Sequence, residues 1–241
     1  MAKERIRAAV RRGAAPLGLM FQMGARHPDF RRLWVASVLS ETGSALSMVA
    51  LPLYVIAVSH SYALAGLLTT VGLLGTLIMR IPGGFVADRW ERRRLMQGAA
   101  AVGAVAMGAV AACTAWHPSG EWAIIGVAWS VNLWVAAAVA PVQSAAVRRT
   151  LPDAEVQTGL AAWQAQYAAV MLVGPLLGGL VFEWAHALPF AVDAASFLGE
   201  LLVLVRIRAS LGGGQAAARG PMRCFAGLLS LCRAGSCGCF R

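Results

Sequence analysis

Residues 33–58 read LWVASVLSETGSALSMVALPLYVIAV, and the only charged side chain among them is that of Glu41. An α-helix rises about 1.5 Å per residue, so about 20 apolar residues suffice to cross the roughly 30 Å of hydrocarbon in a bilayer. This stretch is long enough to cross and too apolar to face water along its whole length. We therefore predict a membrane-spanning helix from Leu33 to Val58.

Five further stretches have the same character, and they are predicted to span near Ala63–Gly83, Leu95–Trp116, Trp122–Ala146, Gly159–Trp184 and Leu188–Ile207. Of the 241 residues, 59% are hydrophobic and 13% are charged, which is about half the charged share of a soluble domain. The sequence thus predicts an all-α membrane protein. A basic cytoplasmic leader (residues 1–32) precedes a six-helix transmembrane bundle (33–208), and an irregular, Cys-rich cytoplasmic tail (209–241) follows it.

The basic residues alternate along the chain in a way that predicts orientation. Apart from Arg80, near the cytoplasmic end of the second predicted span, they lie in the leader, after the sixth span, and in the second and fourth connections. In those two connections they are Arg89, Arg92, Arg93, Arg94, Arg148 and Arg149. The first, third and fifth connections contain no Lys or Arg. Loops rich in Lys and Arg stay in the cytoplasm. Both ends are therefore predicted to be cytoplasmic, in a multi-pass protein of the bacterial plasma membrane.

The net charge of +10 does not indicate nucleic-acid binding, because the basic residues lie between apolar spans and form no single stripe or face. The lipid bilayer is the partner that they predict. Four cysteines crowd the tail: Cys224, Cys232, Cys237 and Cys239. No histidine follows them and no second cluster exists, so neither a metal site nor a cofactor is expected.

An intramembrane enzyme, such as a serine protease, is the alternative class for a chain of this kind. It would need a nucleophile and a base inside the bilayer, for instance a G-x-S-x-G setting with a membrane histidine. No such serine setting occurs, and His60, His117 and His186 fall at the predicted boundaries of the spans. The sequence therefore does not predict an enzyme.

The second connection, from Gly83 to Arg94, reads GGFVADRWERRR. Glycine at a helix end allows a neighbouring helix to approach closely, and an Asp followed by Arg residues can bridge to adjacent helix ends. The stretch resembles the signature loop of the major facilitator superfamily, G-x-x-x-D-R-x-G-R-R/K. The residues that match are Gly84, Asp88, Arg89, Arg92 and Arg93, whereas Glu91 replaces the second glycine.

A second resemblance lies in the fifth span, where Gly174, Pro175, Gly178 and Gly179 match the G-P-x-x-G-G core of the family's antiporter motif. Ala161 and Val170 replace the upstream glycines, and helix packing explains the segment as well as a coupling role does. The fourth span lacks the family's arginine. Stretches at 27–34, 50–53 and 193–198 are similar to the branch that holds macrolide and siderophore exporters.

The resemblance covers about residues 27 to 208, one half of the family's usual twelve helices. It implies a half-bundle of two inverted three-helix repeats with a site near the midplane. It also implies a secondary active transporter that exports a small amphipathic molecule (a drug, macrolide or siderophore-like compound) by alternating access, with proton coupling left open. The signature loop would then latch one access state through charge pairs.

Three carboxylates fall inside predicted spans: Glu41, Asp193 and Glu200. Each costs about 2.5–3.5 kcal/mol at the centre of a spanning helix, so each should face the bundle interior or a wet cavity. They are candidates for binding a proton or a cationic substrate group, and Glu41 is favoured over Asp193. The alternative is that Asp193 and Glu200 hold neighbouring helices together by hydrogen bonds.

The composition changes abruptly after Ile207, where a seventh helix should be approached. This change is typical of a truncated or frame-shifted reading, and we expect a transporter fragment whose C-terminal half is missing. A half that works only as a homodimer, or a non-transporting remnant, is the alternative. In a symmetric pair, like halves would have to satisfy both exposed seams.

Overall fold

The computed structural model describes residues 25–118 and 121–207, without the side chains of residues 85 and 87–89. Within this part of the chain, six helices are long and apolar enough to cross a membrane. They are α2 (Pro28–Ser59), α3 (Tyr62–Arg89), α4 (Arg92–Trp116), α5 (Glu121–Thr150), α6 (Asp153–Trp184) and α7 (Leu188–Val205). The predicted tail and most of the predicted leader lie outside the described residues.

The six predicted spans are confirmed, but several helices are longer than the apolar stretches that indicated them. α3 continues six residues past Gly83, and α6 begins six residues before Gly159. Hydropathy marks only the part of a helix inside the hydrocarbon, and helices continue into the polar interface on favourable end charges. Asp153 and Glu155 lie in the first turn of α6, and Arg148 and Arg149 in the last turn of α5.

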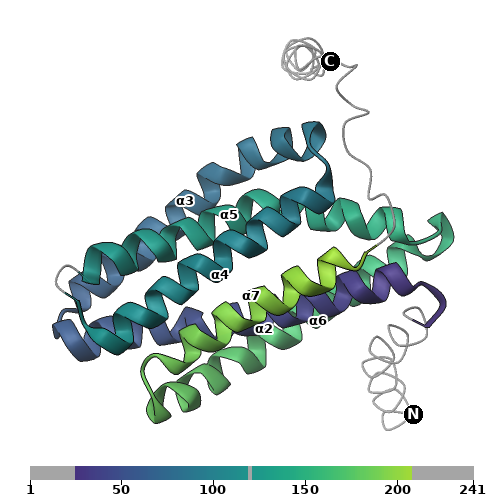
Figure 1. Ribbon diagram of the computed structural model, residues 1–241. Helices are drawn as coiled ribbons and strands as arrows, with labels where there is room; N and C mark the ends of the chain where they lie inside the picture. Colours follow the sequence, from purple (N-terminus) through teal and green to yellow (C-terminus); the bar gives the residue numbers. More distant parts are fainter. Residues whose placement is uncertain (1–24, 119–120, 208–241) are drawn as a thin grey trace, which may run out of the picture.

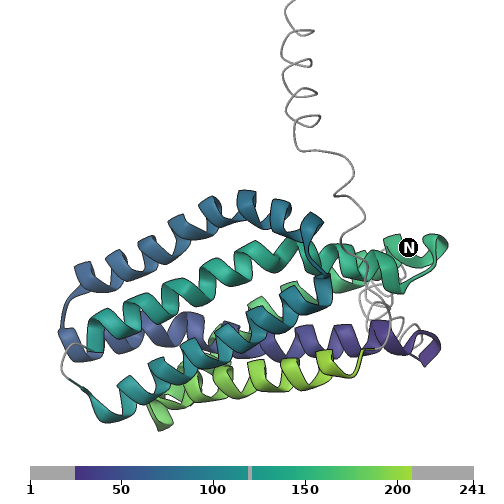
Figure 2. The same ribbon diagram turned by 45° about the horizontal axis from the view of Figure 1, so that its top comes forward.

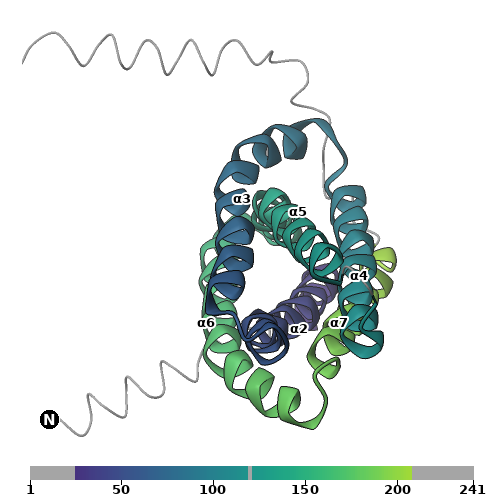
Figure 3. The ribbon, with the colours of Figure 1, turned by 90° about the vertical axis from the view of Figure 1, so that its left-hand side faces the viewer.

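The helices run side by side with their connections alternately at the two ends of the bundle (Figures 1 and 2). Viewed along the helices, α3 and α6 lie on one side, α4 and α7 on the opposite side, and α2 and α5 between them (Figure 3). All the predicted basic connections fall at the same end, because successive helices reverse direction. Which side of the membrane that end faces stays a prediction.

The packing has the symmetry that two three-helix repeats require. α2 packs against α6 and α7, whereas α5 packs against α3 and α4. If the first three helices (α2–α4) are exchanged with the last three (α5–α7), the α2–α7 contact becomes the α5–α4 contact, and the α2–α6 contact becomes the α5–α3 contact. The remaining extensive contact, between α4 and α7, is unchanged by the exchange. α2 and α5 run in opposite directions, so the repeats are inverted.

Two apolar cores hold the bundle together. One lies at the end where the chain enters α2 and is centred on Phe30, Leu33, Val147 and Leu204. The other lies toward the opposite end and is centred on Tyr54, Met107, Ile125 and Phe190. The segments between them on α2, α5, α6 and α7 carry most of the buried polar side chains. The polar positions thus fall near the middle of the bundle.

Candidate functional site

A cavity of about 300 Å³ lies in this polar layer between the two cores. Its walls come from α2, α4, α5, α6 and α7, and among the described residues α3 adds none. The polar side chains in the wall are Ser40, Glu41, Ser44, Asn132, Gln143, Tyr167, Asp193 and Glu200, together with Trp129. The three carboxylates predicted to face the interior are therefore brought together around one space.

Glu41 is held by hydrogen bonds from two helices. The hydroxyl of Ser37, one turn earlier on α2, donates to Oε1 at 2.6 Å. The amide of Gln166 on α6 donates to Oε2 at 2.7 Å. Both oxygens of the half-buried carboxylate thus accept strong hydrogen bonds, and the Gln166 contact ties α2 to α6 at mid-height.

Asp193 is fully buried on α7 and faces α2. Its Oδ1 accepts a hydrogen bond from Ser44 of α2 at 3.3 Å and is 3.5 Å from the hydroxyl of Ser196. Ser47, one turn further along α2 from Ser44, is a third hydroxyl beside this carboxylate. Gly43 permits this approach, because a methyl group there would lie 2.7 Å from Oδ1 and 2.9 Å from the Cα of Asp193.

Glu200 lies two turns further along α7, beside Ser40 of α2. It is 5% exposed. None of the described residues that line the cavity is Lys, Arg or His. A wall with three carboxyl groups and no basic partner is stable only when protons or a bound cation offset the negative charge.

A stripe of serines on α2 was not predicted from the sequence. Ser37, Ser40, Ser44 and Ser47 recur at intervals of three and four residues and are buried or half-buried on the face toward the carboxylates. Ser47 donates to the carbonyl of Pro189 at the start of α7. Residues three and four apart share one helix face. This spacing was the available signal that α2 presents a polar face to the interior.

The deep aromatic residues divide between the cavity and helix packing. Trp129 and Tyr167 line the cavity, and the Nε1 atom of Trp129 has no hydrogen-bond partner among the described residues. Trp134 instead donates to the carbonyl of Gly72 at 3.2 Å, which fastens α5 to α3. Trp163 is buried in the core near the start of α2.

The antiporter-like segment packs α6 against α2 close to the cavity. A methyl group at Gly178 would lie 2.6 Å from the carbonyl oxygen of Leu46, and one at Gly174 would overlap the Cβ of Ala45. Gly179 faces open space, and Pro175 lies inside the continuous helix α6. Two of the three glycines therefore set the distance between α6 and the helix that carries Glu41.

The signature-loop residues lie where α3 ends and α4 begins. A methyl group at Gly84 would meet no atom within 4 Å, whereas one at Gly83 would lie 2.6 Å from the Cα of Ala138 on α5. Arg93 donates to the carbonyl of Val205, the last residue of α7, at 2.6 Å. Arg92 begins α4. The side chains of Asp88 and Arg89 lie outside the described residues, so their latch role stays a prediction.

A second polar cluster joins the opposite ends of α2, α4 and α5. The Tyr54 hydroxyl donates to Oε2 of Glu121 at 3.2 Å and lies 3.1 Å from Nδ1 of His117. The ring of Tyr54 stacks on His117 at 6.2 Å and meets the ring of Phe190 edge-on. The sequence places His117 at the boundary of a span, and it gives no sign of this contact with Tyr54.

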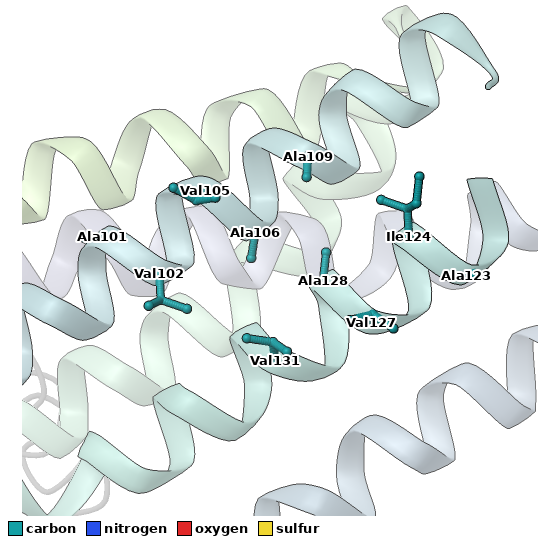
Figure 4. A pocket seen from close by; sticks show the side chains of 10 residues that line it. All are labelled: Ala101, Val102, Val105, Ala106, Ala109, Ala123, Ile124, Val127, Ala128 and Val131. Atoms are coloured by element: carbon teal, nitrogen blue, oxygen red, sulfur yellow. The ribbon is translucent and has the colours of Figure 1, made fainter. Parts of the chain in front are cut away.

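A larger groove, of about 740 Å³, lies between α4 and α5 (Figure 4). Its wall is made of Ala, Val and Ile only: Ala101, Val102, Val105, Ala106, Ala109, Ala123, Ile124, Val127, Ala128 and Val131. It offers no polar group to orient a ligand. Among the described residues, no group of three or more His, Cys, Asp or Glu could hold a metal ion.

Solved structures share this fold. A peptide transporter POT in complex with sulfate aligns with a TM-score of 0.67 and 17% identity over 86% of this chain and 45% of that chain. A POT family transporter in complex with a thioalcohol-conjugated peptide aligns with a TM-score of 0.62 and 16% identity over 85% and 44%. At these identities the likeness shows the fold.

The curated relatives include the multidrug efflux pump Tap of Mycobacterium bovis and of Mycobacterium tuberculosis, each 28% identical over 196 residues. The match covers 79% of this chain and 46% of each relative, so the chain spans about half the length of the relatives it matches. The sequence model of the family described as "Major Facilitator Superfamily" matches residues 33–235, which is most of the chain. The chain is a multi-pass membrane protein of a transporter family, and it belongs to the Major Facilitator Superfamily.

Proposed function

We propose that the chain, although it matches about half the length of its curated relatives, acts as a secondary active exporter. It would move a small amphipathic molecule out of the cell by alternating access, coupled to protons. The observation that carries the proposal is the mid-height cavity with three carboxylates in its wall. Carboxylates inside a membrane bundle are rare and mark substrate or proton pathways. The multidrug efflux relatives support export as the direction.

Glu41 is the favoured proton site. It is only half-buried, so water entering the cavity reaches it more readily than Asp193, which is fully buried. Its hydrogen bond from Gln166 links its charge state to the contact between α2 and α6. Protonation would remove the ionised acceptor and weaken that contact. A proton on Glu41 can therefore change how α6 sits against α2, as coupling requires.

Gradient-driven transport by the full chain tests the proposal. The 241-residue chain is reconstituted into phosphatidylcholine vesicles that enclose DNA. Ethidium, an amphipathic dye, is added outside while the interior is acidic, and its fluorescence on DNA reports inward movement against outward proton flow. We expect gradient-dependent uptake that Glu41→Gln abolishes. The matched control is Glu183→Gln, which removes one carboxylate from the exposed end of α6.

Uptake by Glu41→Gln at the wild-type rate would contradict the role of Glu41. Uptake at the same rate with and without the proton gradient would contradict proton coupling. Both comparisons need equal amounts of folded protein in the vesicles, measured by size-exclusion chromatography of the re-extracted chain.

The second candidate is a six-helix bundle that transports only when paired with another six-helix half. It is favoured because the chain matches about half the length of its curated relatives. Apolar side chains stand exposed along α3 and α6, the two helices on the same side of the bundle: Leu74, Leu77, Ile78, Ile81, Leu172, Leu176 and Leu180. We propose a second copy of this chain as the partner to test.

Counting the subunits in lipid separates the two candidates. Single fluorophores on the chain are bleached in nanodiscs, and the steps per disc are counted at rising ratios of lipid to protein. Pairs that persist on dilution support the second copy. A strict monomer that shows no ethidium uptake would overturn transport by this chain without another half.

A further inference from the structure

We propose that the groove between α4 and α5 binds one phospholipid with an ethanolamine headgroup, whose ammonium group lies at Glu121 while an acyl chain follows the groove. The site is separate from the polar cavity and does not depend on the proposed transport function. Three properties of the groove support this occupant: the direction in which it faces, its depth along the helices, and the charge at its mouth.

The groove faces away from the polar cavity. Val127 and Val131 of α5 line the groove, whereas Trp129, between them in sequence, lines the cavity. Successive residues of a helix are turned by about 100°, so Trp129 points to the opposite side of α5. Val105 and Val127 are 74% and 64% exposed. α4 also lies on the opposite side of the bundle from α3 and α6, where a second half would pack (Figure 3). In a membrane the groove is therefore open to lipid.

The groove reaches about as deep as one leaflet. Its wall on α5 begins at Ala123, in the first turn of that helix, and its deepest wall residue on α4 is Ala101. At 1.5 Å per residue, Ala101 lies about 22 Å from Trp116, the last residue of α4. Half of a bilayer with its headgroups measures about 20–22 Å. One lipid molecule of one leaflet thus has the length of the groove.

The walls suit a hydrocarbon chain but do not choose between lipids. Ala106 and Ala109 of α4 point toward Ile124 and Ala128 of α5 across a space of about 740 Å³ (Figure 4). An acyl chain there gains dispersion contacts from both helices. Lipid tails are as apolar as these side chains, so the hydrophobic effect does not favour one lipid over another. Any selectivity must come from the headgroup.

A carboxylate lies at the mouth of the groove, on the first residue of α5. Glu121 precedes Ile124 by three residues and Ala128 by seven, so it lies on the same side of the helix. Its Oε2 accepts a hydrogen bond from Tyr54 and lies 3.2 Å from Nδ1 of His117. The three connections at this end of the bundle contain no Lys or Arg. An ammonium headgroup complements this charge, whereas an anionic headgroup is repelled by it.

Trp116 supplies a partner for the rest of the headgroup. It follows Ala109 by seven residues on α4, so it lies in line with the groove, and it is 81% exposed. Tryptophan at the level of the headgroups donates its indole N–H to lipid oxygens. A primary ammonium group donates up to three hydrogen bonds, whereas the quaternary ammonium of choline donates none. The mouth therefore favours ethanolamine over choline.

Lipid counting by native mass spectrometry tests the site. The full chain, freed of lipid in detergent, is titrated with phosphatidylethanolamine, its N,N-dimethyl derivative or phosphatidylcholine, all with the same acyl chains. We expect one phosphatidylethanolamine per chain to bind about three- to tenfold more tightly than phosphatidylcholine, because only its headgroup donates several hydrogen bonds to Glu121. The dimethyl derivative, with one N–H group, should lie between them.

Variants then locate the lipid. Glu121→Gln should abolish the preference for phosphatidylethanolamine, whereas Glu183→Gln, which removes an exposed carboxylate at the same end, should keep it. Ala109→Phe fills the groove and should weaken phosphatidylethanolamine at least about threefold. Ala195→Phe, at an exposed position of α7, is its control and should bind as the wild type does. Circular dichroism and size-exclusion chromatography establish that each variant is folded.

The outcomes distinguish this lipid from the other occupants of the groove. Equal affinities for phosphatidylethanolamine and phosphatidylcholine in the wild type would refute the headgroup site without recourse to any variant. A folded Glu121→Gln that keeps the preference would refute the role of Glu121. A folded Ala109→Phe with unchanged affinity would place the lipid outside the groove. A lipid-free dimer that Ala109→Phe disrupts would make a second copy of the chain the occupant and overturn the proposal.

Discussion

Replacing Gly178 by alanine tests whether the antiporter-like segment is a packing device between α6 and α2. The new methyl group would lie 2.6 Å from the carbonyl oxygen of Leu46, 3.0 Å from its Cα and 3.2 Å from its carbonyl carbon. These are backbone atoms, so no side-chain rotation relieves the overlap. The two helices must move apart at the point where α2 carries the cavity residues.

The size of the effect follows from two opposing contributions. Overpacking in a close-packed interior costs about 1–3 kcal/mol. Alanine is preferred over glycine inside a helix by about 0.5–1 kcal/mol, which offsets part of that loss. Gly179→Ala gains the same helix preference and meets no atom within 4 Å. The difference in unfolding free energy between the two variants should therefore be about 1–3 kcal/mol, with Gly178→Ala the less stable.

The assay is reversible unfolding of the purified chain in mixed micelles by a rising fraction of sodium dodecyl sulfate, followed by helical circular dichroism. Both variants and the wild type are unfolded in the same lipid and detergent. Equal midpoints for Gly178→Ala and Gly179→Ala would refute the packing account of this motif. A Gly179→Ala variant less stable than the wild type would show that the space beside Gly179 cannot hold a methyl group.

Two further substitutions probe the polar contacts of the bundle. Gln166→Leu removes the donor to Oε2 of Glu41, and the unpaired carboxylate oxygen should lower the unfolding free energy by about 1–2 kcal/mol in the same assay. The double variant Gln166→Leu/Glu41→Leu should recover part of the loss. A Gln166→Leu variant as stable as the wild type would contradict the contact. Tyr54→Phe removes the hydroxyl that contacts Glu121 and His117, and should cost about 0.5–1.5 kcal/mol. Ser144→Ala, an exposed hydroxyl that bonds only its own helix, is the control that should leave stability unchanged.

The fold could be predicted from the sequence because the membrane imposes a simple rule. About twenty apolar residues are needed to cross it, and charged residues collect outside it. The ends of the helices were less predictable. α6 starts at Asp153 because its acidic first turn is favourable in the interface, which a hydropathy average over an apolar span cannot register.

The candidate site could be predicted only as far as its rarest residues. Glu41, Asp193 and Glu200 stand out because carboxylates are costly in a spanning helix. That they border one cavity depends on the rotation and crossing of α2 and α7, which the sequence alone does not encode in any simple pattern. The resemblance to the signature loop singles out Gly84, whereas it is the neighbouring Gly83 that packs closely against Ala138 of α5.

Proton release on ligand binding is the measurement that tests the central claim most directly, because it does not depend on whether a second half is present. The full chain in weakly buffered nanodiscs is mixed with ethidium, the dye of the transport assay, while a pH indicator records the protons released. We predict a release that saturates with ethidium and is lost in Glu41→Gln but kept in Glu183→Gln. Saturable binding of ethidium without release of protons, in the wild type across neutral and mildly acidic pH, would contradict the claim that substrate binding is coupled to the proton on Glu41.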